Sequence, residues 1–157
     1  MNQRHHIVVN VSGLLTLAFM ALVFGIIFYW LFRPTGSAAF LALLPAPPFT
    51  LKLAVFIEWL GWLPTFLHVL AFSLLSYIVL GNRYALFCCL LWGSVNAFFE
   101  IGQGLPSELI RLLPDIPYLQ SYLIGGVFDP LDFTACVVAS LVAWILLITY
   151  ESTTGGN

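Results

Sequence analysis

The sequence predicts an all-α integral membrane protein, a bundle of four transmembrane helices with two long loops that carry short interfacial or re-entrant helices. The chain is 61% hydrophobic and only 8% charged, whereas an ordinary soluble domain is roughly 25% charged. Four apolar runs are long enough to cross a hydrocarbon core of about 30 Å. Prolines and charged residues gather in the two long connections between these runs. We expect one transmembrane domain over residues 1–157.

The first two spans are predicted at about residues 7–32 and 64–80. We interpret the first as a retained span, because it is longer than the apolar core of a signal peptide and no small-residue cleavage site follows it. The second ends at the turn sequence Gly81-Asn82-Arg83. The third follows at 84–103, and so short a connection makes the second and third spans antiparallel neighbours. The fourth span is predicted at 130–150.

The two long loops have different compositions. Residues 51–62 of the first loop read "LKLAVFIEWLGW", where a Lys, a Glu and two Trp among apolar residues favour an interfacial helix. The second loop, residues 104–129, is cut by prolines into short helical pieces. We expect the aromatic side chains of both loops to anchor them at the membrane interface; they are Trp59, Trp62, Tyr118 and Tyr122.

Composition also excludes some functions. The net charge is −2, so the chain lacks the excess of basic residues that nucleic-acid binding requires. The three cysteines, Cys88, Cys89 and Cys136, lie inside apolar runs and are interpreted as packing residues rather than disulfides or metal ligands. We expect no metal and no cofactor, and membrane lipids or a lipid-linked molecule as partners.

The distribution of basic residues favours one orientation. Arg4 and Arg83 lie in short segments without acids, whereas Lys52 and Arg111 lie on long loops that also carry acids. Short basic segments face the cytoplasm. We therefore predict a multi-pass protein of the cell inner membrane with both termini in the cytoplasm.

Four polar residues form the candidate ligand-binding site: His68, Glu100, Gln103 and Asp132. A charged side chain at the bilayer centre costs at least about 2.5–3.5 kcal/mol, so we expect these groups to face the bundle interior. Gln103 follows Glu100 by three residues and shares its face of the helix. The order of the spans brings all four to one depth, on the side of the long loops.

The stretch "VFDPLDF", residues 127–133, allows two interpretations. Asp129 and Asp132 are three residues apart, so they share a helix face and can act together as acid and base. The same letters also describe a helix start, with Asp129 as the cap and Pro130 at the first helical position. Capping accounts for Asp129. One acid is enough to cap the helix, so the presence of Asp132 favours a functional role for this second acid.

Three motifs, "FLHVLAF", "FFEIGQ" and "FDPLDF", resemble in this order those of the VanZ-like membrane proteins, over about residues 64–150. The resemblance implies functional roles for the matching His68, Glu100, Gln103 and Asp132. The founding member of that family is associated with resistance to a lipoglycopeptide antibiotic. This chain departs from the family pattern before the Asp motif, where it reads Gly125-Gly126-Val127 instead of carrying an Arg.

These observations predict a small membrane protein that binds an amphiphilic or lipid-linked envelope ligand at a polar cluster near the outer face. An accessory subunit of a larger membrane complex is the first alternative. An enzyme acting on a lipid head group is the second, with Glu100 and Asp132 as acid and base, although the sequence has no recognised nucleophile. Proton or ion transport is a further alternative.

Overall fold

The computed structural model describes residues 3–32, 59–114, 116 and 119–154, and this part of the chain is helical with no strand. Four of the helices are long and apolar enough to cross a membrane. The predicted all-α class and its four long helices are confirmed to that extent. Their bounds are α1 Gln3–Phe32, α3 Leu63–Leu80, α4 Ala85–Gln103 and α7 Pro130–Thr154.

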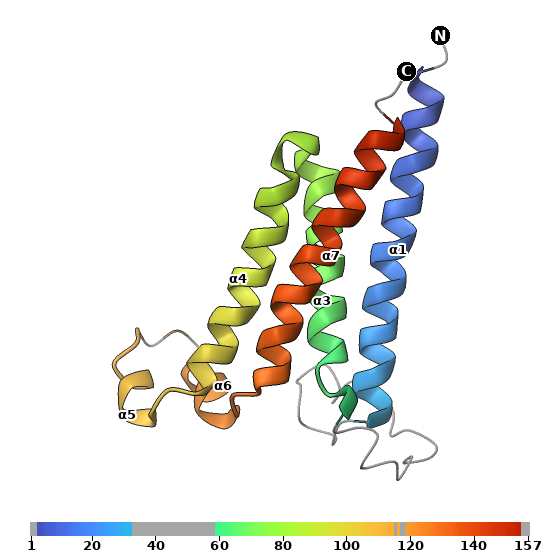
Figure 1. Ribbon diagram of the computed structural model, residues 1–157. Helices are drawn as coiled ribbons and strands as arrows, with labels where there is room; N and C mark the ends of the chain where they lie inside the picture. The colour runs from blue at the N-terminus through green and yellow to red at the C-terminus, as the bar shows by residue number, and fades with distance from the viewer. Residues whose placement is uncertain (1–2, 33–58, 115, 117–118, 155–157) are drawn as a thin grey trace.

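The four long helices run up and down, and α3 lies among the other three (Figure 1). It contacts α1, α4 and α7, whereas α1 packs mainly against α3. The start of α1, the end of α7 and the turn between α3 and α4 lie at one end of the bundle (Figure 1). The connections that contain α5 and α6 lie at the opposite end, which we call the loop end.

The turn between α3 and α4 depends on a glycine. Gly81 has φ +87°, a left-handed conformation that side chains with a Cβ rarely adopt, and its N–H donates to the Tyr77 carbonyl over 2.8 Å. A single 3₁₀ turn, η2 Asn82–Tyr84, then leads directly into α4. The predicted antiparallel pair of the second and third spans is confirmed.

Helix α7 begins with a capped end. The Asp129 Oδ1 atom accepts a hydrogen bond of 2.8 Å from the Leu131 N–H, and the Asp129 carbonyl accepts one of 3.1 Å from the Phe133 N–H. Pro130 occupies the first helical position, where its missing N–H is not needed. The cap interpretation of Asp129 is therefore confirmed, and Asp132 lies in the first turn of the helix.

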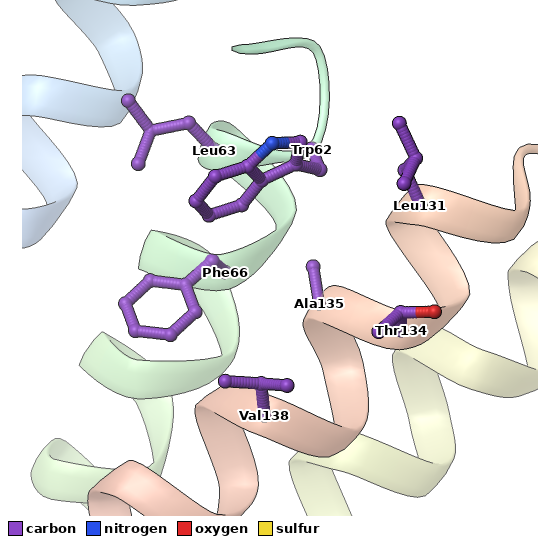
Figure 2. Close-up of a pocket in the computed structure, with 7 residues that line it drawn as sticks. All are labelled: Trp62, Leu63, Phe66, Leu131, Thr134, Ala135 and Val138. Atoms are coloured by element: carbon purple, nitrogen blue, oxygen red, sulfur yellow. The ribbon is translucent and has the colours of Figure 1, made fainter. Parts of the chain in front are cut away.

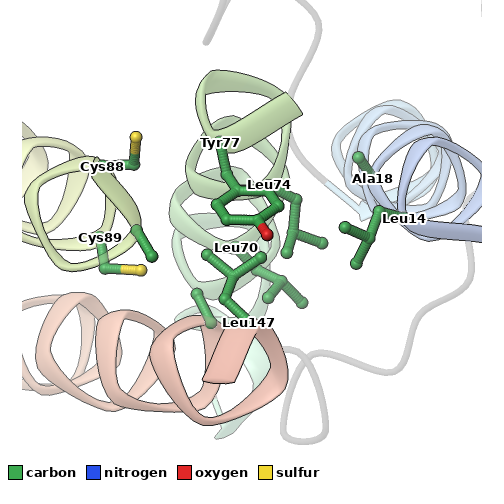
Figure 3. Packing of buried hydrophobic residues seen from close by; sticks show 10 residues of the cluster. Leu14, Ala18, Leu70, Leu74, Tyr77, Cys88, Cys89 and Leu147 are labelled. Atoms are coloured by element: carbon green, nitrogen blue, oxygen red, sulfur yellow. The ribbon is translucent and has the colours of Figure 1, made fainter. Parts of the chain in front are cut away.

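The main hydrophobic core joins all four long helices (Figure 3). Leu70 and Leu74 of α3 lie at its centre, with Leu147 of α7 beside them. Cys88 and Cys89 of α4 are buried in it and are free thiols, as is the buried Cys136 of α7. The interpretation of the cysteines as packing residues is confirmed.

The second long loop carries two short helices, α5 Ser107–Ile110 and α6 Leu119–Gly125, as its prolines predict. The Leu123 side chain is buried against α4, where a Cβ added to Gly102 would lie 2.8 Å from its Cδ2. The helix predicted within residues 51–62 lies largely outside the described residues. That these loops lie at the membrane surface stays a prediction.

Candidate functional site

Glu100 is a buried carboxyl group on α4, with 9% of its surface exposed. It lies seven residues, about two helical turns, beyond Gly93 and therefore on the same face of the helix. Gly93 lies close against α7, because a Cβ added there would overlap the Ser140 Oγ atom. Glu100 therefore faces α7.

Asp132 lies opposite Glu100 on α7. The two helices are antiparallel (Figure 1), and Gly93 lies beside Ser140, so seven residues further along α4 correspond to seven residues back along α7. Position 100 is then level with position 133. Both carboxyl groups lie close enough to the Cys136 thiol, one turn beyond Asp132, to interact with it electrostatically. We conclude that Glu100 and Asp132 lie at one level on the facing sides of α4 and α7.

Gln103 is the last residue of α4 and closes the site toward the loop end. Its side chain lies against the backbone of Gly126, between α6 and α7, so closely that a Cβ at position 126 would overlap it. The linker before α7 thus passes over the end of α4 at the turn that follows Glu100. A shared site of Gln103 and Glu100 stays a prediction.

His68 departs from its predicted position, because its side chain is exposed rather than directed into the bundle. Its ring stacks on Phe72 with centroids 4.6 Å apart, and Phe72 lies 4.7 Å from Trp92 of α4. The Trp92 Nε1–H donates to the Ser76 Oγ atom over 2.7 Å. The rotation of α3 is fixed by the burial of Val69, Leu70, Ala71, Ser73, Leu74 and Tyr77, and this leaves position 68 on the outer surface.

The depth of His68 is close to that of Glu100. Trp92 of α4 contacts both Phe72 and Ser76 of the antiparallel helix α3. Counting back from these two contacts puts position 68 level with the turn of α4 between positions 96 and 100. Asn96 lies one turn from Glu100 and donates its amide hydrogen to the Trp92 carbonyl over 2.9 Å. A ligand-binding role for His68 stays a prediction.

Sequence reasoning missed an apolar pocket of about 300 Å³ between α3 and α7 (Figure 2). Its lining residues lie at spacings of three and four on α7, but any buried or lipid-facing stripe has the same spacing. No signal in the sequence therefore distinguished it. The lining residues are Trp62, Leu63 and Phe66 at the start of α3, and Leu131, Thr134, Ala135 and Val138 on α7.

The chemistry available between α4 and α7 is that of two carboxyl groups in apolar surroundings. Carboxylate oxygens accept hydrogen bonds and attract cations, and a protonated carboxyl group also donates one. Among the described residues, no group of three or more His, Cys, Asp and Glu side chains is placed to hold a metal ion. The arrangement suits the recognition of hydrogen-bond donors.

Comparison with known proteins adds no family to this picture. No family model matches the chain, and the searches of curated proteins and of solved structures find no match either. The resemblance to the VanZ-like proteins therefore rests on the three quoted motifs alone and stays a prediction.

Proposed function

We propose that this protein spans the cell inner membrane and binds an amphiphilic, lipid-linked envelope ligand, whose polar end lies between Glu100 and Asp132. The observation that carries this proposal is the burial of Glu100 opposite Asp132. Ionisable groups inside a bundle are costly, and they mark binding sites and ion pathways more often than packing. Four spans with one buried acid pair offer few polar groups for an ion to pass along, which favours ligand binding over ion transport.

The acid pair restricts the polar end of this ligand. Two neighbouring carboxyl groups repel a phosphate and attract an ammonium group or the N–H and O–H donors of amines, amides and sugars. Gln103 adds an amide group that both donates and accepts. The favoured head group is therefore rich in hydrogen-bond donors.

His68 is not part of this head-group site in our proposal, because its ring is exposed on the outer side of α3. A polar ring that faces outward from an apolar helix favours the alternative function, an accessory subunit that docks on a second membrane chain. The two functions differ in what accompanies the purified protein: an amphiphile in the first and a foreign polypeptide in the second.

Glu100→Gln provides the direct test. We expect the wild-type protein, purified in mild detergent, to retain one amphiphile with a donor-rich head group, identified by mass spectrometry. Hydrogen bonds to charged groups contribute about 1.5–3 kcal/mol, so Glu100→Gln should weaken retention by about tenfold to a hundredfold. Glu108→Gln, a change at an exposed acid of α5, is the matched control and should retain the ligand.

Two results would overturn this proposal. Equal retention by the wild type and Glu100→Gln would exclude a head-group site at Glu100. A second polypeptide in the native mass spectrum, with no amphiphile, would favour the accessory subunit.

The proposed orientation places the loop end at the outer face, and cysteine labelling tests it. Arg83 and Leu112 are exposed at opposite ends of the bundle. An impermeant maleimide added to intact cells should label Leu112→Cys and not Arg83→Cys. The native thiols give little background because all three are buried. Labelling at position 83 alone would invert the orientation, and labelling of both positions would exclude the four-span topology.

A further inference from the structure

The pocket between α3 and α7, which we call the α3–α7 groove, is apolar along its whole length. Its one hydroxyl group is already bonded, since the Thr134 Oγ–H donates to the Pro130 carbonyl over 2.8 Å. The aromatic rings of Trp62 and Phe66 face Leu131, Ala135 and Val138 across it (Figure 2). The surface of the groove is therefore almost entirely hydrocarbon.

The shape of the α3–α7 groove suits a hydrocarbon chain. From Leu131 to Val138 it follows seven residues of α7, a length of about 10 Å. Its volume is about 300 Å³, and it is open to the outside. An extended hydrocarbon chain can lie along it in contact with both helices.

The position of the groove indicates that lipid fills it. Both of its walls belong to helices apolar and long enough to cross a membrane, and the lower end lies at the first turn of α7, beside the Asp129 cap. In a bilayer, an open apolar groove at this level is surrounded by lipid acyl chains. Trp62 lies at the same end, where an indole ring suits the boundary between head groups and hydrocarbon.

We propose that the α3–α7 groove is a lipid site that holds one acyl chain of a bilayer phospholipid along Phe66, Ala135 and Val138, with Trp62 at its mouth. This site goes beyond the proposed function, because it depends on membrane insertion and not on the head group bound at Glu100. The acid pair and the groove share the first turn of α7, where Leu131 lines the groove and Asp132 faces α4. Each site can nevertheless fail its own test while the other passes.

Fluorescence quenching by a phosphatidylcholine with brominated acyl chains tests the groove in reconstituted bilayers. The phosphatidylcholine head group has no N–H or O–H donor, and any attraction of its ammonium group to the acid pair is the same in every variant compared, because all of them keep Glu100 and Asp132. The chain has five tryptophans, and the contribution of Trp62 is the difference between the wild type and Trp62→Phe. Trp144→Phe supplies the same measurement for Trp144, which is exposed on α7 and does not line the groove. We expect Trp62 to be quenched at a several-fold lower mole fraction of brominated lipid than Trp144.

A matched pair of valines shows whether the groove is responsible. Val138 and Val137 are both exposed neighbours on α7, but only Val138 lines the groove. Val138→Phe should fill the groove, so that quenching of Trp62 requires as high a mole fraction of brominated lipid as quenching of Trp144. Val137→Phe should leave the mole fraction that quenches Trp62 unchanged. If Val138→Phe does not fold, Thr134→Leu at the rim replaces it.

Three results would overturn the proposal. The first is quenching of Trp62 and Trp144 at the same mole fraction in the wild type. The second is an unquenched Trp62, which would mean that protein covers the groove. The third is an equal effect of Val138→Phe and Val137→Phe.

Discussion

Asp132→Asn is expected to weaken ligand binding strongly and leave the bundle folded, whereas Asp129→Asn is expected to change neither binding nor folding. The reason is that the two carboxyl groups have different roles. Asp129 caps α7 through the Leu131 N–H, and Asn caps a helix nearly as well as Asp. Asp132 faces α4 beside the Cys136 thiol, opposite Glu100. Losing its charge should weaken ligand retention by about tenfold to a hundredfold.

The retention assay and a thermal unfolding curve measured on the same samples separate the two roles. Asp129→Ala removes the cap and should destabilise the protein by about 0.5–2 kcal/mol while it retains the ligand. Loss of the ligand from a folded Asp129→Asn protein would show that both carboxyl groups belong to the site. Full retention of the ligand by Asp132→Asn would show that "VFDPLDF" only starts a helix and has no part in binding.

The largest expected effect on stability is that of Gly93→Ala. A methyl group at this position would overlap the Ser140 Oγ atom, and it would lie 3.3 Å from the Ser140 Cβ atom and 3.5 Å from the Cys136 carbonyl oxygen. The Ser140 hydroxyl is held there by its hydrogen bond of 2.8 Å to the same carbonyl. Helices α4 and α7 must therefore separate or lose this bond, and we expect a cost of about 1–3 kcal/mol.

A double-mutant cycle identifies the cause of that cost. Ser140→Ala removes the overlapping oxygen, so the double variant Gly93→Ala/Ser140→Ala should recover most of the stability lost in Gly93→Ala, a coupling of about 0.5–3 kcal/mol. Gly25→Ala in α1 is the control, because nothing lies within 4 Å of the added methyl group. It should be neutral or slightly stabilising. The free energy of unfolding in detergent is the measurement, and equal stabilities of Gly93→Ala and Gly25→Ala would contradict the close approach.

Much of the fold was predictable because the signals are local. The lengths of the apolar runs fix where the spans lie: 130–150 was predicted for the helix Pro130–Thr154, and 64–80 for Leu63–Leu80. The cap at Asp129 was predictable because its partner is two residues away. The reversal at Gly81 was predictable because the connection is too short for any other arrangement.

The site was predictable only in part, since it depends on how helices are rotated. Glu100 is buried, and Asp132 lies at its level on the facing helix, because carboxyl groups avoid the apolar exterior and the span order fixes their depth. The role of the two residues in binding stays a prediction. The direction of the His68 side chain was not predictable, because the packing of its apolar neighbours determines the rotation of α3.

The sequence by itself determined the helices, their order, their capped and turning ends, and the small set of polar residues that apolar spans contain. Only the tertiary structure decided that Gly93 meets Ser140, that His68 points outward, and that Trp62 and Val138 border one groove. The physical reason is that the long helices carry apolar residues on several faces, and α1 on nearly every one. Hydrophobicity then separates span from loop, but only the fit of side chains between helices distinguishes a face that meets protein from one that does not.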